Sequence, residues 1–290
     1  MHDPQGAPEG TPNGAAPRIR RARGYRLYGI DGRRYLDLHQ DGGRAILGHR
    51  GGRAVTAMKN ALSEGLHSSL PSVYEARLIK ALARAFPGCR SFRLFASESR
   101  ALEALSRTLG APFAPSDIFD PAIGAPPGDR PRVARWRPFL PAECAAWLDG
   151  VEALLPVLPL AVGEAPAAVC FRDGQPPGCL ESDALPGFLL AGVLAAFSAV
   201  LAGDGASGAA PGEGLRPVER VLDSSRTWGR RGRYVRALFD AAAYPAIHRQ
   251  FLQGGVLLGP SHPGPSILPA ECSPGEGSLL AGLFLGIPGG

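Results

Sequence analysis

Two lysines are the first residues to consider, because a lysine amine is the side chain that forms a Schiff base with an aldehyde. Lys59 and Lys80 are the only lysines among the 290 residues. Each lies in a segment with helical spacing, at a position where an exposed side chain is the ordinary interpretation. The sequence therefore predicts that neither lysine does chemistry.

Cysteine and histidine offer little more. The five cysteines form no close CxxC pair, which indicates reduced thiols in a cytoplasmic protein and no metal site. The histidines are expected to be structural or surface residues. The residues concerned are Cys89, Cys144, Cys170, Cys179 and Cys272, with His39, His49, His67, His248 and His262.

Arginine dominates the basic residues, and the net charge is +5. Clusters at 18–26, 130–137 and 226–236 include Tyr or Trp, a combination that favours a nucleic-acid-binding hypothesis. The chain holds 29 arginines, 39 glycines and 29 prolines, a bias typical of GC-rich coding. Solvated faces and pairing with carboxylates explain the clusters more simply, so nucleic acid is the third of three hypotheses.

The secondary structure that would support a site is predicted most clearly between Gly24 and Arg107. Alternating runs flank Asp31-Gly32, a pair that predicts a β-hairpin. Apolar residues at helical spacing predict helices over 54–66 and 75–82, each with an apolar stripe. The run Arg93-Leu94-Phe95 predicts a strand, and a helix follows Ala96-Ser97-Glu98-Ser99.

In that order, the hairpin, Leu36-Asp37-Leu38, Ile46-Leu47-Gly48-His49, the two helices and 93–101 resemble the entry segment of class III pyridoxal-phosphate-dependent aminotransferases. Within that family the chain is most similar to the glutamate-1-semialdehyde aminomutase branch. The resemblance implies an α/β fold of the type I pyridoxal-phosphate transferases, reduced in size. That fold has a three-layer α/β core and a small α+β domain built from both termini.

The rest of the chain is interpreted against this framework. Residues 109–141 are expected to be loop with short elements at most, 147–155 a helix, and 167–171 a buried strand. Residues 185–201 predict a helix that begins near Pro186; the uncharged stretch 184–203 approaches membrane-spanning length, but a core helix fits it better. Near the C-terminus we expect helices at 244–252 and 279–285 around a short strand within 255–261. The last helix completes the small domain.

The resemblance also implies a phosphate-binding turn at the start of the helix after Phe95. Ser97 and Ser99 align with its hydroxyl residues and are the candidate cofactor-binding residues, as a remnant of the turn. Glu98 stands where the family has glycine, and Arg100 where it has glutamate. The simpler alternative is that Ser97 is only a helix N-cap.

Two further requirements of the family are not met. No residue matches the catalytic lysine, and the strand that supplies the acidic partner of the pyridine nitrogen should lie between Phe171 and Pro186, where only Asp173 and Asp183 remain as nominal substitutes. One deletion that removed both the acid strand and the lysine strand explains this. Bound pyridoxal phosphate is therefore expected only if the fold retains its site.

The sequence thus predicts a degenerate aminotransferase-like protein that lacks catalysis and serves as a binding or partner subunit; an active pyridoxal-phosphate enzyme is the alternative. A truncated parallel sheet would expose an edge or an apolar face, so we expect a homodimer with 185–201 in or near the interface. The predicted divisions are a flexible tail at 1–23, a small-domain segment with the linking helix at 24–90, a truncated large domain at 91–201, a linker at 202–214 and the C-terminal part of the small domain at 215–290.

Overall fold

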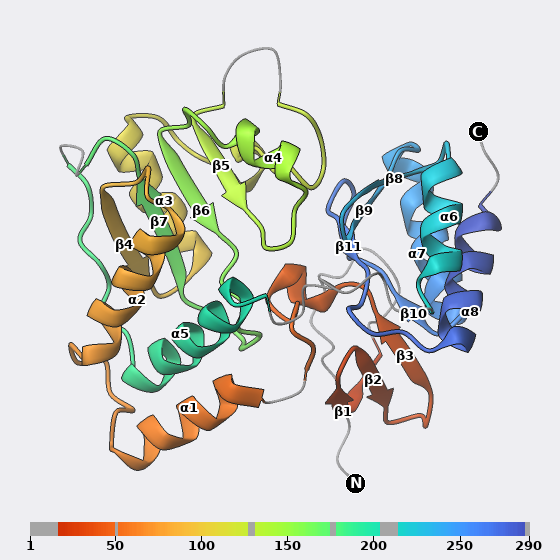
Figure 1. The fold of residues 1–290 in the computed structure, drawn as a ribbon, viewed down its shortest axis with the longest axis horizontal. Coiled ribbons are helices and arrows are strands. Elements are labelled where there is room, and N and C mark those ends of the chain that lie inside the picture. The colour runs from red at the N-terminus through yellow and green to blue at the C-terminus, as the bar shows by residue number, and fades with distance from the viewer. Residues whose placement is uncertain (1–16, 50–51, 127–130, 175–177, 204–213, 288–290) are drawn as a thin grey trace, which may run out of the picture.

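The computed structural model describes residues 17–49, 52–126, 131–174, 178–203 and 214–287. Figure 1 shows two bodies side by side. One holds the middle of the chain, and the other brings the N-terminal strands together with the C-terminal helices.

The larger body is built on a sheet with the order β4-β7-β6-β5. Its strands are β4 (Ser91–Phe95), β5 (Val133–Trp136), β6 (Ala153–Pro156) and β7 (Ala167–Phe171). β7 runs antiparallel to both β4 and β6, and only β5 and β6 are parallel. The prediction of a parallel sheet is therefore wrong, because β7 lies between β4 and β6 and runs antiparallel to both.

Both edges of this sheet are covered by the chain itself. At β4, the Leu94 amide donates to Ser182 Oγ at 3.0 Å, and the Asp183 amide donates to the Leu94 carbonyl at 2.8 Å. At β5, Phe119 forms an isolated parallel bridge with Ala134. The expected open edge is thus absent among the described residues, since loops occupy the hydrogen-bonding groups there.

Helices cover the two faces of the sheet and make three layers (Figure 1). Ala168 and Cys170 of β7 face a core shared with α2 (Val73–Ala85) and α5 (Gly187–Leu201), whereas Val169 and Phe171 face a second core beneath α3 (Glu98–Leu109). This alternation is the period-2 pattern of a strand buried on both sides. The predicted three-layer α/β core is confirmed.

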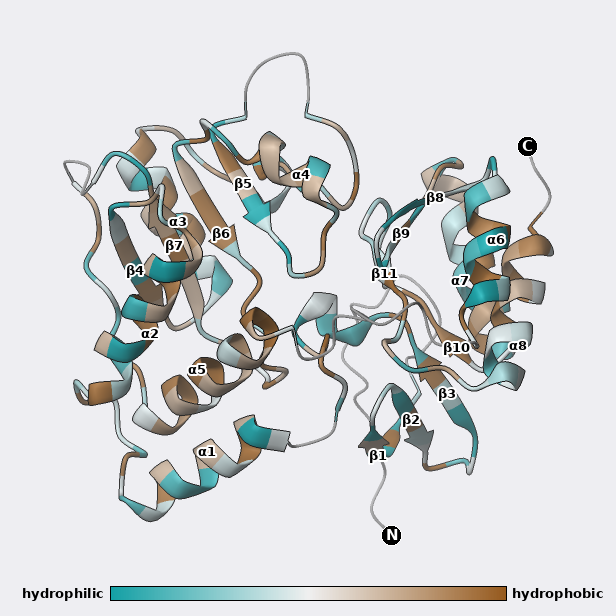
Figure 2. Cartoon of the chain, in the orientation of Figure 1, coloured by the Kyte–Doolittle hydropathy of each residue, from teal (hydrophilic) through white to brown (hydrophobic). Residues whose placement is uncertain are grey.

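α5 lies in the core, as predicted, and is the most continuously apolar helix in Figure 2. α1 (Gly52–Ser63) packs across it so closely that a Cβ at Gly192 would lie 2.6 Å from Met58 Cγ. No helix within the described residues is long and apolar enough to cross a membrane. α1 buries little of its expected apolar stripe, and Val55 and Leu62 are exposed.

The smaller body combines both ends of the described chain. β1 (Ile19–Arg23), β2 (Arg26–Gly29) and β3 (Arg34–Asp37) form an antiparallel meander around Asp31-Gly32, where Gly32 has φ +81°. β10 (Val256–Leu257) joins β3 in parallel. The predicted hairpin is confirmed, and the sheet unites segments more than 200 residues apart.

A second small sheet and three helices complete this body. The sheet has the order β11-β9-β8, from β8 (Trp228–Arg231), β9 (Tyr234–Ala237) and β11 (Ser266–Ile267). α6 (Arg216–Ser224), α7 (Tyr244–Gln253) and α8 (Pro274–Leu285) enclose one core with Tyr25, Leu36 and Leu38. The predicted helices near 244–252 and 279–285 are α7 and the second half of α8.

Two further sequence-based interpretations are wrong. The predicted helix at 147–155 is instead the end of α4 (Ala142–Trp147), a turn with Gly150 at φ +80°, and the buried strand β6. The predicted tail at 1–23 extends too far, since 19–23 form β1. The rest of that tail up to residue 16, and the predicted linker from 204 to 213, lie outside the described residues.

Candidate functional site

The start of α3 is the position from which the candidate site is built. Ser97 is the N-cap of α3, and its Oγ accepts a hydrogen bond from the Arg100 backbone N–H at 3.3 Å. Ser99 is exposed on the first turn. The Ser97 hydroxyl therefore satisfies the helix itself, as the simpler alternative predicts.

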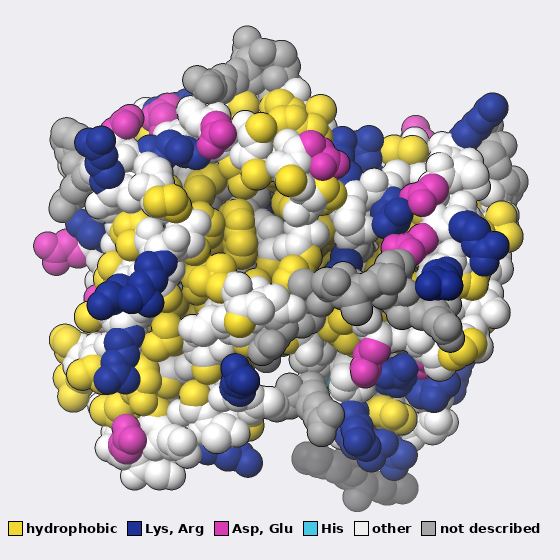
Figure 3. Space-filling model, viewed as in Figure 1, with side chains coloured by type: hydrophobic (Ala, Val, Ile, Leu, Met, Phe, Trp, Pro, Cys, Tyr) yellow, Lys and Arg dark blue, Asp and Glu magenta, His cyan; other side chains and the backbone are white. Residues whose placement is uncertain are grey.

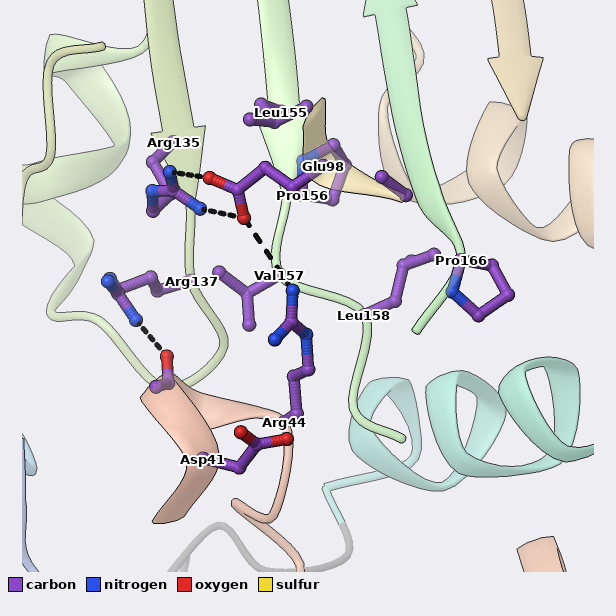
Figure 4. Close-up of a pocket in the computed structure, with 12 residues that line it drawn as sticks. Asp41, Arg44, Glu98, Arg135, Arg137, Leu155, Pro156, Val157, Leu158 and Pro166 are labelled. Carbon is purple, nitrogen blue, oxygen red and sulfur yellow. Dashed lines mark hydrogen bonds and ion pairs between the residues drawn. The ribbon is translucent and has the colours of Figure 1, made fainter. Parts of the chain in front are cut away.

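Glu98, the first residue of α3, is the centre of the site. Arg135 Nη2 and Nη1 donate to its two carboxylate oxygens at 2.6 and 3.3 Å, and Arg44 Nη2 lies 3.6 Å from the same carboxylate (Figure 4). Burial disfavours the charged form, but the hydrogen bonds and charge of Arg135, with the charge of Arg44, outweigh it and hold the pKa of Glu98 below its ordinary value. Glu98 is thus a fixed anion between two guanidinium groups.

A second ion pair lies directly beside the first. Arg137 Nε donates to both Asp120 oxygens, at 3.0 and 2.8 Å, and Arg137 Nη1 donates to the Gly42 carbonyl at 2.7 Å. Both charged side chains are buried. Gly42 belongs to the short 3-10 helix η1 (Gln40–Gly43), where Asp41 and Gly42 have φ of 49° and 65°. Arg44 follows η1, so these contacts join the two bodies.

The cavity around these groups is small. Its volume is about 150 Å³, whereas pockets for small organic ligands typically measure about 300–1,000 Å³. Figure 4 shows the ion pairs of Glu98 with Arg135 and Arg44, and Val157 and Leu158 are among the lining residues. The residues that line it are Asp41, Gly42, Arg44, Glu98, Arg135, Arg137, Leu155, Pro156, Val157, Leu158, Pro166 and Ala167.

A second carboxylate lies next to the same helix start. Asp183 Oδ2 accepts from the Ala96 amide at 2.9 Å, and Asp183 Oδ1 lies 3.1 Å from Arg100 Nη2. Burial raises the pKa of Asp183, but the hydrogen bonds from Arg100 and Ala96 lower it by more. Carboxylates from Glu98 and Asp183 therefore stand where a bound anion would need hydrogen-bond donors and positive charge.

The remaining sequence candidates lie elsewhere. Lys59 and Lys80 are exposed on α1 and α2 and do not line the cavity, and Asp173 is exposed. His49 Nε2 pairs with Asp37 Oδ2 at 2.7 Å, which makes it a structural residue. Within the described residues the five thiols are free, and no cluster of three His, Cys, Asp or Glu side chains could hold a metal ion.

Among the described residues, the aromatic side chains of the three arginine clusters are not exposed for stacking. Tyr25, Trp228 and Tyr234 are buried, and the half-buried Trp136 packs against Phe86 and Phe197. Several of the arginines pair with carboxylates, as the simpler interpretation expects: Arg26 with Glu276, Arg132 with Glu152, Arg135 with Glu98, Arg137 with Asp120 and Arg230 with Asp223. The clusters at 130–137 and 226–236 therefore support structure rather than base stacking.

Arg44, Arg135, Arg137 and Asp120 are the site residues that sequence reasoning missed. Arg44 follows η1, Arg135 lies on β5, Arg137 follows β5 directly, and Asp120 lies in the loop before β5; each meets its partner across at least 17 residues of chain. The spacing of Arg135 and Arg137 by two residues at the end of a strand is the signal that was available, because residues two apart in an extended chain share a face.

Comparison with known proteins finds a relative that aligns with most of this chain. No family model matches the sequence. An uncharacterized protein of Treponema pallidum is 31% identical over 292 residues, which cover 87% of this chain and 89% of that protein. A glutamate-1-semialdehyde 2,1-aminomutase of Syntrophus aciditrophicus is 36% identical over 95 residues, but this match covers 32% of this chain and only 22% of the enzyme.

The architecture is similar over a much longer span. An omega-transaminase from Sphaerobacter thermophilus superposes with a TM-score of 0.66 at 14% identity, covering 92% of this chain and 90% of the transaminase chain. The fold is therefore that of the type I pyridoxal-phosphate transferases, as the sequence predicts.

The residues at the start of α3 do not fit the cofactor that this fold implies. Pyridoxal phosphate needs a lysine for its aldehyde and donors for its phosphate. The cavity has no lysine in its lining, its centre holds the Glu98 carboxylate, and its volume of about 150 Å³ is below that of ordinary ligand pockets.

Proposed function

Because this chain belongs to the same family as the uncharacterized Treponema pallidum protein and has the fold of the type I pyridoxal-phosphate transferases, we propose that it is a non-catalytic member of that fold. Its role is that of a binding or partner subunit. The observation that carries the proposal is the Glu98 carboxylate, paired with Arg135 in a cavity that no lysine lines. Schiff-base chemistry requires an amine that this arrangement does not supply.

The test is an absorption titration of the purified protein with pyridoxal phosphate, before and after borohydride reduction, followed by mass analysis. We expect no saturable imine band and no label fixed at a single residue. A band that saturates, with borohydride fixing the label at Lys59 or Lys80, would establish an internal aldimine. That result would favour the alternative, an active aminotransferase or aminomutase, and overturn the proposal.

We further propose that the subunit is a homodimer. The core helix α5 leaves only Leu201 as a large exposed hydrophobic residue, so the apolar surface near it comes from α1 and the segment that leads into α2. Val55, Leu62, Leu70 and Val73 are 39 to 65% exposed there, and Figure 3 shows hydrophobic side chains gathered over the larger body. A second copy that covers them would remove this surface from water.

A further inference from the structure

β1 is an edge strand whose outer side has no partner among the described residues. In the sheet order β1-β2-β3-β10, it pairs only with β2. An edge of this kind presents a row of backbone N–H and C=O groups that can pair with another extended chain. The feature therefore offers a template for strand addition.

The same strand carries positive charge without matching carboxylates. Arg18, just before β1, and Arg20, Arg21 and Arg23 within it are exposed, and none forms an ion pair with a carboxylate in the described part of the chain. Figure 3 shows Lys and Arg side chains gathered over the β1–β3 region. Four exposed cations within six residues therefore give this edge a positive charge that no carboxylate of the described residues offsets.

The neighbouring acidic residues already form ion pairs with another arginine. Arg26 of β2 takes both oxygens of Glu276, at 2.7 and 2.6 Å, and also contacts Glu271 at 3.4 Å. Arg23 lies directly opposite Arg26 in the pairing of β1 with β2. Because Glu276 is paired with Arg26, it does not form an ion pair with Arg23.

Arg21 is held in an extended position above the sheet. It lies opposite Tyr28, and its guanidinium carbon is 4.3 Å from the centre of the Tyr28 ring. This cation–π contact keeps the charge on the sheet surface and leaves the guanidinium without a carboxylate partner. Arg21 and Arg23 face the same side, because alternate residues of a strand do so.

These charges disfavour pairing of β1 with β1 of a second copy. Two such strands side by side would place arginines opposite arginines, and like charges that face each other across strands are destabilising. The same charges attract a strand of opposite sign. The edge and its cations together therefore select a heterologous partner.

We propose that β1 is the docking strand for an extended acidic segment of another protein, which adds to the sheet beside β1 and places Glu or Asp side chains against Arg21 and Arg23. This inference rests on the proposed role as a binding subunit and names the chemistry of the partner. Its readout is independent of pyridoxal phosphate, so either proposal can fail alone.

The experiment measures binding of a fluorescent eight-residue peptide of alternating Glu and Val to the full chain by anisotropy. The variant R21E/R23E is expected to lose about tenfold or more in affinity, because two exposed ion pairs become repulsive. R216E/R226E changes the net charge equally at exposed arginines outside β1 and is the matched control. It should retain binding to within about twofold.

A second peptide, with proline in place of each valine, separates strand addition from charge attraction alone. It keeps the carboxylates but lacks half of the N–H donors, so we expect it to bind at least about tenfold more weakly. Equal binding of both peptides, no binding of the Glu-Val peptide at low salt, or an oligonucleotide bound more tightly than the peptide would each overturn the inference.

Discussion

At the scale of single residues, the Glu98 carboxylate places a negative charge at the N-terminus of α3. A carboxylate at the first helical residue is stabilised by the helix dipole, and Arg135 and Arg44 reach it from β5 and from the residue after η1. In the described part of the chain no second carboxylate lies as close to these two guanidinium groups, since Asp120 lies 3.9 Å from Arg135 and is bonded to Arg137. Removal of Glu98 would leave two positive charges beside a helix N-terminus.

The Glu98→Ala variant tests this arrangement. We expect it to unfold with a free energy lower by about 1–3 kcal/mol, because two partly buried guanidinium groups lose their hydrogen-bonded anion. We also expect inorganic phosphate to raise the melting temperature of this variant more than chloride does at equal ionic strength, because a free anion can then enter. Thermal unfolding in the two salts measures both effects.

Glu103→Ala is the matched control on the same helix. Glu103 pairs with Arg100 and Arg107 on the surface of α3, and such exposed pairs contribute about 0–1 kcal/mol. Its stability should change little, with no phosphate-specific effect. If native protein responds to phosphate as strongly as Glu98→Ala does, Glu98 does not occupy the anion position.

Local sequence predicted part of this site. The N-cap role of Ser97 follows from its position before an apolar helical repeat. The partners of Glu98 do not follow, because Arg44 and Arg135 lie 54 residues before it and 37 residues after it. In a chain with 29 arginines, residue type alone does not indicate which of them meet.

At the scale of elements, one ion pair joins β2 to α8 across 250 residues of chain. Ser273 and Glu276 form a capping box at the start of α8, and Arg26 donates to both oxygens of Glu276. The hydrogen bonds from Arg26, against the opposing effect of burial, lower the pKa of Glu276 to about 2. This contact ties the N-terminal sheet to the last helix.

The Glu276→Gln variant is expected to be less stable than native protein by on the order of 1–2 kcal/mol at neutral pH, after allowance for solvent screening. A carboxyl group whose pKa is lower in the folded state stabilises that state above its unfolded pKa and loses the effect as the pH falls. The difference between the two proteins should therefore narrow as the pH falls from about 4.5 toward about 2. Urea unfolding at neutral pH and near pH 3 measures it.

Glu271→Gln provides the comparison for that experiment. Glu271 is 70% exposed and lies 3.4 Å from the same arginine, so its loss should cost no more than about 0.5 kcal/mol at either pH. A constant difference between native protein and Glu276→Gln across this pH range would show that the charge of Glu276 does not carry the effect.

The elements that sequence predicted well have strong local signals. The Asp31-Gly32 turn, α2, β7 and α5 each combine a clear period with a recognisable boundary. The run at 147–155 lacks such a period, since its apolar residues suit either a helix or a buried strand. Gly150, at φ +80°, ends the turn after α4, and all four residues of β6 are buried between β5 and β7. Tertiary packing therefore determined that this segment forms a strand and not a helix.

At the scale of the whole molecule, apolar cores support the fold, and charged side chains define the candidate site at their margin. Leu155, Leu158 and Ala167 belong to the cores of the larger body and also line the charged cavity at the start of α3. Burial of apolar surface dominates stability, so the charged side chains at this margin can differ while the fold is kept. The fold is accordingly similar to that of a transaminase at only 14% identity.

The proposed homodimer can be tested by charged substitutions on the exposed surface of α1. Val55→Glu combined with Leu62→Glu changes two residues of α1 that are 39% and 44% exposed, so the folded monomer should lose only about 0.5 kcal/mol per site. If a second copy covers α1, two buried carboxylates would disrupt the interface, and light scattering should give half the native mass with unchanged circular dichroism. Leu238→Glu, at an exposed residue of the other body, should leave the mass unchanged. A native protein that is already monomeric would contradict the proposal, and a double variant that stays dimeric would move the interface away from α1.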